Sequence, residues 1–168
     1  MNKKIKNILG WIVYIVCSIL IVFLLSNYVF LHGHVSSNSM YPTVTVGDNF
    51  ICIRENFNFN PIKTGDIIVF NHIKEDGSKS LYVKRVIGIP GDKLYFKNDS
   101  VYVNDIEYND FAYGKTEATS LVYNKEIVVP EDCYFVLGDN REHSLDSRYW
   151  DYLYVNKSDI VARTLFIK

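Results

Sequence analysis

The pattern of hydrophobic and polar residues divides the chain into one long apolar segment near the N-terminus and a series of short alternating segments after it. Residues 8–31 form a run of 24 positions without a formal charge. At about 1.5 Å of rise per residue, a helix of this length spans the roughly 30 Å hydrocarbon core of a bilayer. The segment therefore predicts a single transmembrane helix, with Trp11, Tyr14 and Tyr28 near the two membrane interfaces.

The charged residues that flank this apolar segment predict its orientation in the cell membrane. Three lysines precede it within residues 3–6, whereas no Asp, Glu, Lys or Arg follows it before Asp48. Lys and Arg are enriched on the cytoplasmic side of membrane helices. We therefore expect a cytoplasmic basic tail, a transmembrane anchor and an extracytoplasmic domain, at residues 1–7, 8–31 and 32–168.

A cleaved secretion signal is the alternative interpretation of the same segment. Such signals have an apolar region of about 7 to 15 residues and small residues of the Ala-x-Ala type before the cut. The apolar region here is longer and lacks that sequence, so a retained anchor is preferred. Val35 and Ser37 would nonetheless fit a cut after Ser37, including one made by the protein itself.

After residue 32 the pattern is that of β-strands, because short segments rich in β-branched and aromatic residues alternate with turn residues. Asn98-Asp99 is typical of a hairpin turn, and Pro90-Gly91-Asp92 indicates another chain reversal. Residues 109–124 have weak periodicity and predict a long loop. We expect a mainly β domain behind the helix. Its predicted strands are 50–53, 66–70, 82–89, 94–97, 100–103, 126–129, 133–137 and 160–166.

Composition and charge narrow the functional classes. With 168 residues, 48% apolar and 22% charged, the chain can form one folded domain and an anchor. A net charge of −1 and the lack of a basic block beyond the N-terminus argue against nucleic acid as a partner. His32 and His34 have no Cys, Asp or Glu cluster nearby, so no metal or other cofactor is expected. Cys52 and Cys133 are interpreted as buried free thiols, with a disulfide as the alternative.

Ser39 is the candidate nucleophile, because it follows the apolar segment closely and would therefore work at the membrane surface. A serine hydroxyl is a poor nucleophile at neutral pH. It needs a base, donors for the oxyanion and a group that orients the base. Histidine is the usual base, but His143 is flanked by charged and polar residues in a predicted loop. A Ser-His-Asp triad is therefore disfavoured.

Lys84 is the other candidate base. It lies in the apolar segment 81–87, where strand alternation places it and Arg85 on opposite faces. One of these two cations should face the interior, where burial without a counter-charge lowers a lysine pKa. The alternative is an edge strand with both cations facing water or paired with Asp92 or Asp146. From composition alone, this alternative is the preferred interpretation.

Four segments, taken together, change that preference. They are residues 39–43, 65–70, 82–92 and 138–148. In this order and behind an N-terminal anchor, they closely resemble the conserved boxes of bacterial type I signal peptidases, and the resemblance covers nearly the whole chain. It implies the β-fold of signal peptidases and LexA-like peptidases. Only 45 residues separate Asp92 from Gly138, which resembles the compact form of Gram-positive bacteria.

The resemblance also implies roles for individual residues. Ser39 matches the nucleophile, Lys84 the general base, Ser144 the serine that orients the lysine amine, and Ser37 a hydroxyl of the oxyanion hole. Three further residues match supporting positions: Asp146 and Arg148 are expected to form an ion pair that holds the loop with Ser144, with Arg85 as a candidate third member. The glycine-containing segments 65–66 and 138–140 are interpreted as tight turns.

The activity implied by the resemblance is removal of N-terminal signal peptides from secretory preproteins through an acyl-enzyme. Substrates would carry small residues one and three positions before the cut and would bind as an added strand while their apolar segment stays in membrane lipid. A dedicated role in pilin processing would use the same motifs. So would self-cleavage of the repressor type, which the anchor disfavours. An inactive membrane-anchored assembly module is a further alternative, disfavoured because all four catalytic positions are filled.

Overall fold

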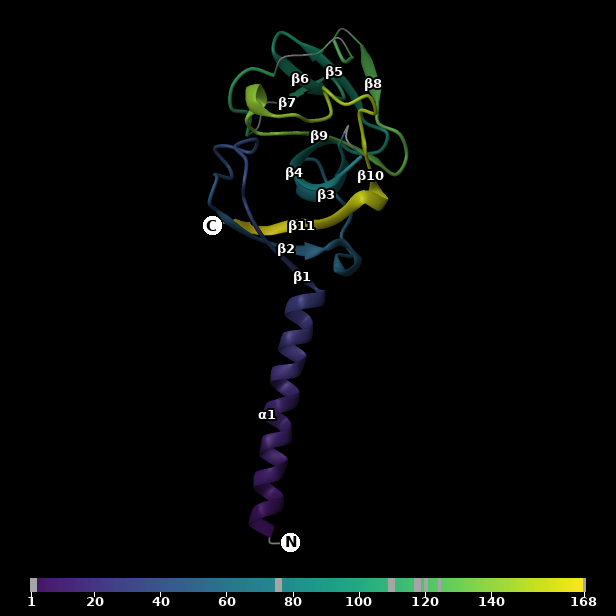
Figure 1. Ribbon diagram of the computed structural model, residues 1–168. Helices are drawn as coiled ribbons and strands as arrows, with labels where there is room; N and C mark the ends of the chain where they lie inside the picture. The colour runs from purple at the N-terminus through teal and green to yellow at the C-terminus, as the bar shows by residue number, and fades with distance from the viewer. Residues whose placement is uncertain are drawn as a thin grey trace.

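The protein consists of one long helix and a β-rich domain carried on its end (Figure 1). Helix α1 (Lys3–Tyr28) is apolar enough to cross a membrane, with a mean hydropathy of 2.9 and none of that stretch buried against the domain. A core helix of a soluble protein would be mostly buried, so the exposure of α1 fits an anchor in lipid. The computed structural model describes residues 3–74, 77–108, 111–116, 119, 121–123 and 125–167.

The helix ends at Tyr28, before the end of the expected span 8–31, because the chain continues as a strand. Strand β1 (Phe30–His34) pairs antiparallel with β2 (Asn49–Arg54) and forms one edge of a sheet. Its Leu31 packs against a cluster of buried apolar residues beneath the sheet. The hydrophobic run does not reveal this change, because Phe30 and Leu31 are as apolar as the helix before them.

Two antiparallel sheets build the domain in the part of the chain that the structure describes. The seven-stranded sheet has the order β1-β2-β11-β3-β4-β9-β10, and the four-stranded sheet β7-β6-β5-β8 lies at the end far from α1 (Figure 1). The remaining strands are β3 (Ile67–Ile73), β4 (Lys79–Gly88), β5 (Lys93–Lys97), β6 (Ser100–Val103), β7 (Ile106–Tyr108), β8 (Glu126–Val128), β9 (Cys133–Leu137), β10 (Val155–Asn156) and β11 (Ile160–Ile167). Three 3₁₀ turns are η1 (Glu55–Phe57), η2 (Arg141–His143) and η3 (Lys157–Asp159).

The prediction of a mainly β domain behind one helix is confirmed. All eight predicted strands are present, whereas β1, β7 and β10 were not predicted. The last two contain three and two residues, which is too short for an alternating pattern to show. Asn98 and Asp99 form the turn between β5 and β6, with positive φ at both positions. The predicted loop 109–124 lies partly outside the described residues, and its described positions form only isolated bridges.

Three clusters of buried apolar side chains form the core. One cluster contains Met40 and Val44, so it lies directly beneath the segment that carries Ser39. Cys52 belongs to this cluster and Cys133 to another, and both are buried free thiols, as expected.

Candidate active site

The turn that carries Ser39 is anchored by buried residues on its C-terminal side. Met40 and Val44 are 2% and 1% exposed, and the Val44 N–H donates to the Met40 carbonyl at 2.9 Å. Ser39 is half-buried, whereas Ser37 is exposed. Because Met40 is fixed in the core, its neighbour Ser39 is held at the surface of the domain in one place.

Strand β4 buries two neighbouring cations on opposite faces. Lys84 and Arg85 are each 4% exposed, and β4 lies between β3 and β9 in the sheet. Strand β4 pairs with β3 along Lys79–Arg85 and with β9 from Arg85 onward. The interpretation that both cations face water is therefore wrong, because both are buried. The opposite orientation of the two side chains is confirmed, since Lys84 lines a cleft and Arg85 contacts Asp139.

Burial changes the protonation of the Lys84 amine. It lowers the pKa of Lys84 from 10.5 to about 8, an effect that the Asp146 carboxylate opposes and the Arg148 guanidinium reinforces. The Nζ atom lies 5.8 Å from the centre of the Tyr82 ring. With a pKa of about 8, roughly a tenth of the amines are neutral at pH 7, whereas an ordinary lysine is almost wholly charged.

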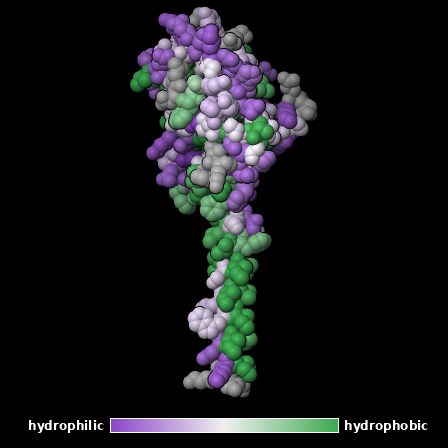
Figure 2. Space-filling model, turned by 90° about the vertical axis from the view of Figure 1, so that its left-hand side faces the viewer, coloured by the Kyte–Doolittle hydropathy of each residue, from purple (hydrophilic) through white to green (hydrophobic). Residues whose placement is uncertain are grey.

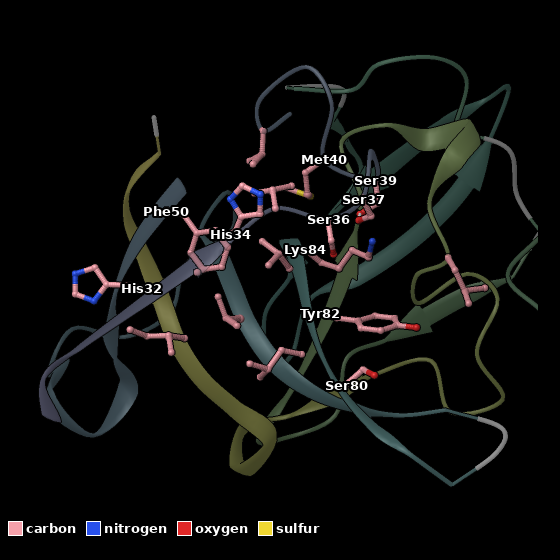
Figure 3. A pocket seen from close by; sticks show the side chains of 18 of the residues that line it. His32, His34, Ser36, Ser37, Ser39, Met40, Phe50, Ser80, Tyr82 and Lys84 are labelled. Carbon is pink, nitrogen blue, oxygen red and sulfur yellow. The ribbon is translucent and has the colours of Figure 1, made fainter. Parts of the chain in front are cut away.

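Ser37, Ser39 and Lys84 line one cleft of about 720 Å³. Figure 3 shows the Lys84 side chain extending toward the corner of this cleft where the two serines lie. The hydroxyl oxygens of Ser37 and Ser39 are 3.4 Å apart. The structure therefore places two hydroxyls and an amine with a lowered pKa in a shared space that is open to solvent.

One wall of this cleft is an open strand edge. Residues 80–84 of β4 line it, and among the described strands β4 has only β3 beside it before Arg85. The opposite wall includes the segment 31–37, which leads from β1 to the Ser39 turn. A cleft with an unpaired strand edge along its side suits an extended peptide, because that peptide can pair with the exposed backbone groups.

Ser144 lies against Gly138, beside the Ser39 turn. A Cβ atom at Gly138 would come within 2.2 Å of the Ser144 hydroxyl oxygen and 2.4 Å of the Ser39 carbonyl oxygen. Glycine is therefore needed at position 138 for close approach and not, as interpreted from the sequence, for a tight turn. Ser144 is 6% exposed, and its hydroxyl has no hydrogen-bond partner among the described residues.

Asp139 connects the strand of Lys84 with the turn of Ser39, a role that the sequence analysis missed. Its buried carboxylate accepts hydrogen bonds from Arg85 Nε at 2.8 Å and Nη2 at 2.6 Å, and from the Thr43 hydroxyl at 2.6 Å. Arg85 therefore pairs with Asp139, and the expectation that it pairs with Asp146 or Asp92 is wrong. The sequence signal was weak, since an Asp after Gly is equally typical of a turn.

Asn140 makes a second connection that sequence analysis missed. Its backbone N–H donates to the Ser39 carbonyl at 3.1 Å, and its side-chain amide donates to the Asn38 carbonyl at 3.0 Å. The loop after β9 thus holds the carbonyl groups immediately before and after the Ser39 α-carbon.

The expected ion pair between Asp146 and Arg148 is present, and both side chains are fully buried. Arg148 donates to Asp146 from Nε at 2.9 Å and from Nη2 at 3.0 Å. The same carboxylate accepts the Gly138 N–H at 3.0 Å, while Arg148 Nη2 also donates to the Arg141 carbonyl at 2.7 Å. The pair therefore fixes both ends of the loop that carries Ser144.

Three histidines lie at the surface. His143 belongs to η2, is exposed and lines the same cleft as Ser39, so it stays an alternative base. His32 and His34 are exposed on β1. Among the residues that the structure describes, no group of three or more His, Cys, Asp or Glu side chains is placed to hold a metal ion.

Comparisons with known proteins bear on the family to which the chain belongs. The profile of the family "Signal peptidase, peptidase S26" matches residues 8–168. Signal peptidase I P of Bacillus subtilis subsp. natto is 37% identical over 168 residues, covering 96% of this chain and 89% of that protein. Signal peptidase IB of Staphylococcus aureus strain COL is 33% identical over 176 residues, with the same coverage. A crystal structure of a signal peptidase I from Enterococcus faecalis V583 is 27% identical, with a TM-score of 0.48, and covers 65% of this chain and 100% of that one. The chain belongs to the signal peptidase family, peptidase S26.

Proposed function

We propose that this protein is a membrane-anchored serine peptidase that removes N-terminal signal peptides from secretory preproteins. The observation that carries the proposal is the buried Lys84 amine, whose pKa is lowered to about 8, in the same cleft as Ser39. Membership of the family and the relatives named signal peptidase I support the substrate class. The exposed apolar helix α1 supports attachment to a membrane.

The proposed chemistry uses three side chains and one backbone N–H. Neutral Lys84 accepts the proton of the Ser39 hydroxyl as that oxygen attacks the scissile carbonyl carbon. The Ser37 hydroxyl and the Ser39 backbone N–H donate to the oxyanion, and removing one such donor typically costs about 2.7 to 4 kcal/mol of transition-state stabilisation. Protonated Lys84 then gives its proton to the leaving amine, and in the second half it activates a water molecule that hydrolyses the acyl-enzyme.

Ser144 is proposed to orient the Lys84 amine. Its buried hydroxyl has no hydrogen-bond partner among the described residues, and the close packing on Gly138 holds it beside the Ser39 turn. Asp146, Arg148 and Arg85 are proposed as supporting residues, because their ion pairs fix the loop and the strand that present the reacting groups.

The precursor is proposed to bind as an added strand along the open edge of β4. Backbone pairing there would leave the scissile carbonyl near Ser39, while alternate side chains would enter the cleft. Small residues are proposed one and three positions before the cut, with the apolar segment of the precursor still in lipid. The catalytic domain is proposed to be extracytoplasmic and the N-terminus cytoplasmic, on the basis of the lysines in the first turn of α1.

The test compares variants of the full-length protein in detergent or lipid, acting on a purified precursor. We expect Ser39→Ala and Lys84→Ala to lose cleavage by at least about two orders of magnitude, since a positioned base contributes about 10²- to 10⁴-fold. His143→Ala, at the rim of the same cleft, is the matched control and should stay near the wild-type rate. Near-normal turnover by folded Lys84→Ala would contradict the proposal, and loss of activity in His143→Ala would favour a histidine base.

A further inference from the structure

The Tyr82 ring forms part of the cleft wall beside the Lys84 amine. Its centre lies 5.8 Å from Lys84 Nζ, and Tyr82 lines the same cleft as Ser39. Figure 3 shows the Tyr82 side chain beside that of Lys84, extending in the same direction. The residue immediately before the scissile bond carries the carbonyl that Ser39 is proposed to attack. Its side chain is therefore the part of the substrate closest to this wall.

Three aromatic rings, those of Phe70, His72 and Trp150, form a ring cluster behind Tyr82. The ring centres of His72, Phe70 and Trp150 lie 4.7, 6.2 and 6.4 Å from that of Tyr82. His72 and Trp150 are stacked on each other, with 4.4 Å between their centres and 29° between their planes. Aromatic rings attract one another at separations of about 4.5 to 7 Å, so the ring cluster holds Tyr82 in a defined position.

The ring cluster connects β3 with the loop after η2. Phe70 lies opposite Tyr82 in the β3–β4 pair, and His72 follows two residues later on the same face of the sheet. Trp150 comes from the loop after η2 and is 8% exposed. Phe70, His72 and Trp150 do not themselves line the cleft, whereas Tyr82 does. The ring cluster therefore acts on a bound peptide through Tyr82.

His72 is the member of the ring cluster whose replacement should disturb the core least. Phe70 and Trp150 belong to a cluster of buried apolar residues, whereas His72 is half-buried. Burial, together with the positive charge of Lys84, lowers the pKa of His72 from its usual value, so its ring is mainly uncharged at pH 7. Among the described residues, His72 makes no side-chain hydrogen bond or ion pair. Its contribution is therefore that of a packed, neutral ring.

We propose that His72 is a positioning residue that fixes the Tyr82 ring and thereby sets the largest side chain that the cleft accepts immediately before the cut. This inference rests on the proposed function, because it names what limits the substrate of that same site. With His72 in place, the Tyr82 ring is packed on its β3 side, so a larger substrate side chain meets a fixed wall. Without the imidazole, Tyr82 can move into the vacated volume, and the cleft becomes wider beside Lys84.

The test compares the full-length protein and its variants in detergent, because α1 presents hydrophobic side chains over most of its length (Figure 2). Two model peptides differ only in the residue before the cut, which is alanine in one and 2-aminobutyrate, longer by one methylene group, in the other. One methylene group in an apolar pocket changes kcat/KM by about 10- to 200-fold. The wild type should prefer alanine, and we expect His72→Ala to reduce that preference at least about five-fold.

Two further variants separate the ring from the imidazole, and a third is the matched control. His72→Asn is polar but lacks the ring, so it should reduce the preference as His72→Ala does. His72→Phe keeps a neutral ring and should retain the preference. The control is Ile73→Ala, at the next residue of β3, whose side chain is 62% exposed and points to the opposite face. It should keep the wild-type preference.

An unchanged preference in both variants without the ring overturns the proposal, even if both rates fall, because a purely structural role lowers the two rates together. Loss of the preference in His72→Phe also overturns it, since the imidazole and not the packed ring would then matter. In both cases the wild type still cleaves the alanine peptide, so the proposed function stands. A wild-type protein that cleaves neither peptide contradicts the proposed function, and this inference with it.

Discussion

Lys84 and Arg85 are adjacent cations whose side chains have different surroundings in the fold. Arg85 meets the Asp139 carboxylate through two hydrogen bonds, so its charge is matched within the interior. Lys84 faces the cleft beside the Tyr82 ring, and burial lowers its pKa to about 8. A buried charge with a hydrogen-bonded partner stays charged, whereas a buried amine without one loses its proton more readily. Strand alternation thus separates a structural cation from a proposed base.

The pKa of Lys84 predicts the pH dependence of cleavage. A base acts in its deprotonated form, so kcat/KM for a model peptide should rise as the pH increases through about 8 and then level off. Below pH 7 the rate should fall about ten-fold for each unit, because the neutral amine becomes ten-fold rarer. A rate measured between pH 5 and 9 that stayed flat would contradict a lysine base.

The same shift predicts that Lys84 lowers the stability of the folded protein. Below pH 8 both the folded and the unfolded state bind the proton, and the cost of the buried charge, about 3 kcal/mol for a pKa reduced from 10.5 to about 8, is fully present. Between pH 8 and 10.5 only the unfolded state stays protonated, so stability rises with pH. Lys84→Met should therefore raise the free energy of unfolding at pH 7 by up to about 3 kcal/mol.

Denaturant titrations at pH 7 and pH 10 measure this difference between Lys84→Met and the wild type. The gain should shrink at pH 10, where the folded wild type no longer carries the charge. If Lys84→Met is less stable than the wild type at pH 7, the Lys84 ammonium is stabilised by a partner in the folded state and is not destabilised by burial.

At the scale of elements, the loop after β9 joins the two segments that carry the proposed dyad. Asp139 binds Arg85 on β4 and Thr43 in the nucleophile turn, and Asn140 binds the Ser39 carbonyl. Strand β4 and the turn therefore keep a common position because one short loop holds both. Neither Asp139 nor Asn140 was assigned to the site from the sequence alone.

Asp139→Asn tests this connection. The substitution leaves the buried Arg85 guanidinium without a carboxylate, and breaking a buried pair in this way costs about 3 to 5 kcal/mol. We expect that loss in the free energy of unfolding, together with a lower kcat, as measured by denaturant titration and by peptide cleavage. Asp132→Asn is the matched control: its carboxylate is 81% exposed and lies 3.7 Å from Lys157, so its change should be small. Similar stability of the two variants would contradict a central role for Asp139.

How far the sequence predicts these elements depends on the range of the interactions involved. Alternation along 81–87 correctly separates Lys84 from Arg85, because side-chain direction in a strand is a local property. The partner of Arg85 is 54 residues away in sequence, and no local pattern identifies Asp139. Gly138 was interpreted as a turn residue because the approach of Ser144 and Ser39 to its α-carbon is visible only in three dimensions. Strand β1 was missed because its first residues continue the apolar run of the anchor.

At the scale of the whole molecule, the anchor and the domain share a boundary that lies at Tyr28 and Val29, since β1 already belongs to the sheet. A soluble domain should therefore begin before Phe30. Removal of residues 1–27 should leave the sheet intact, whereas removal of 1–34 deletes β1 and the packing of Leu31 on the core. We expect the shorter fragment to be less stable by about 1 kcal/mol or more, since Leu31 is half-buried and full burial of such a side chain contributes about 1.5 to 3 kcal/mol.

Denaturant titration of the two fragments measures this difference, and cleavage of a soluble peptide shows whether the cleft survives. Segment 31–37 forms one wall of the cleft, so the shorter fragment should also bind peptide more weakly. Equal stability and equal KM would show that β1 belongs functionally to the anchor and not to the domain.

The two faces of β4 also limit how the length of this chain can change during evolution. Inserting or deleting one residue between Lys79 and Arg85 would exchange the positions of the two cations, placing a guanidinium in the cleft and an amine against Asp139. No compensating point substitution restores both contacts at once. Relatives of different length should therefore gain or lose residues outside this part of β4, while the number of residues from Lys79 to Arg85 stays constant.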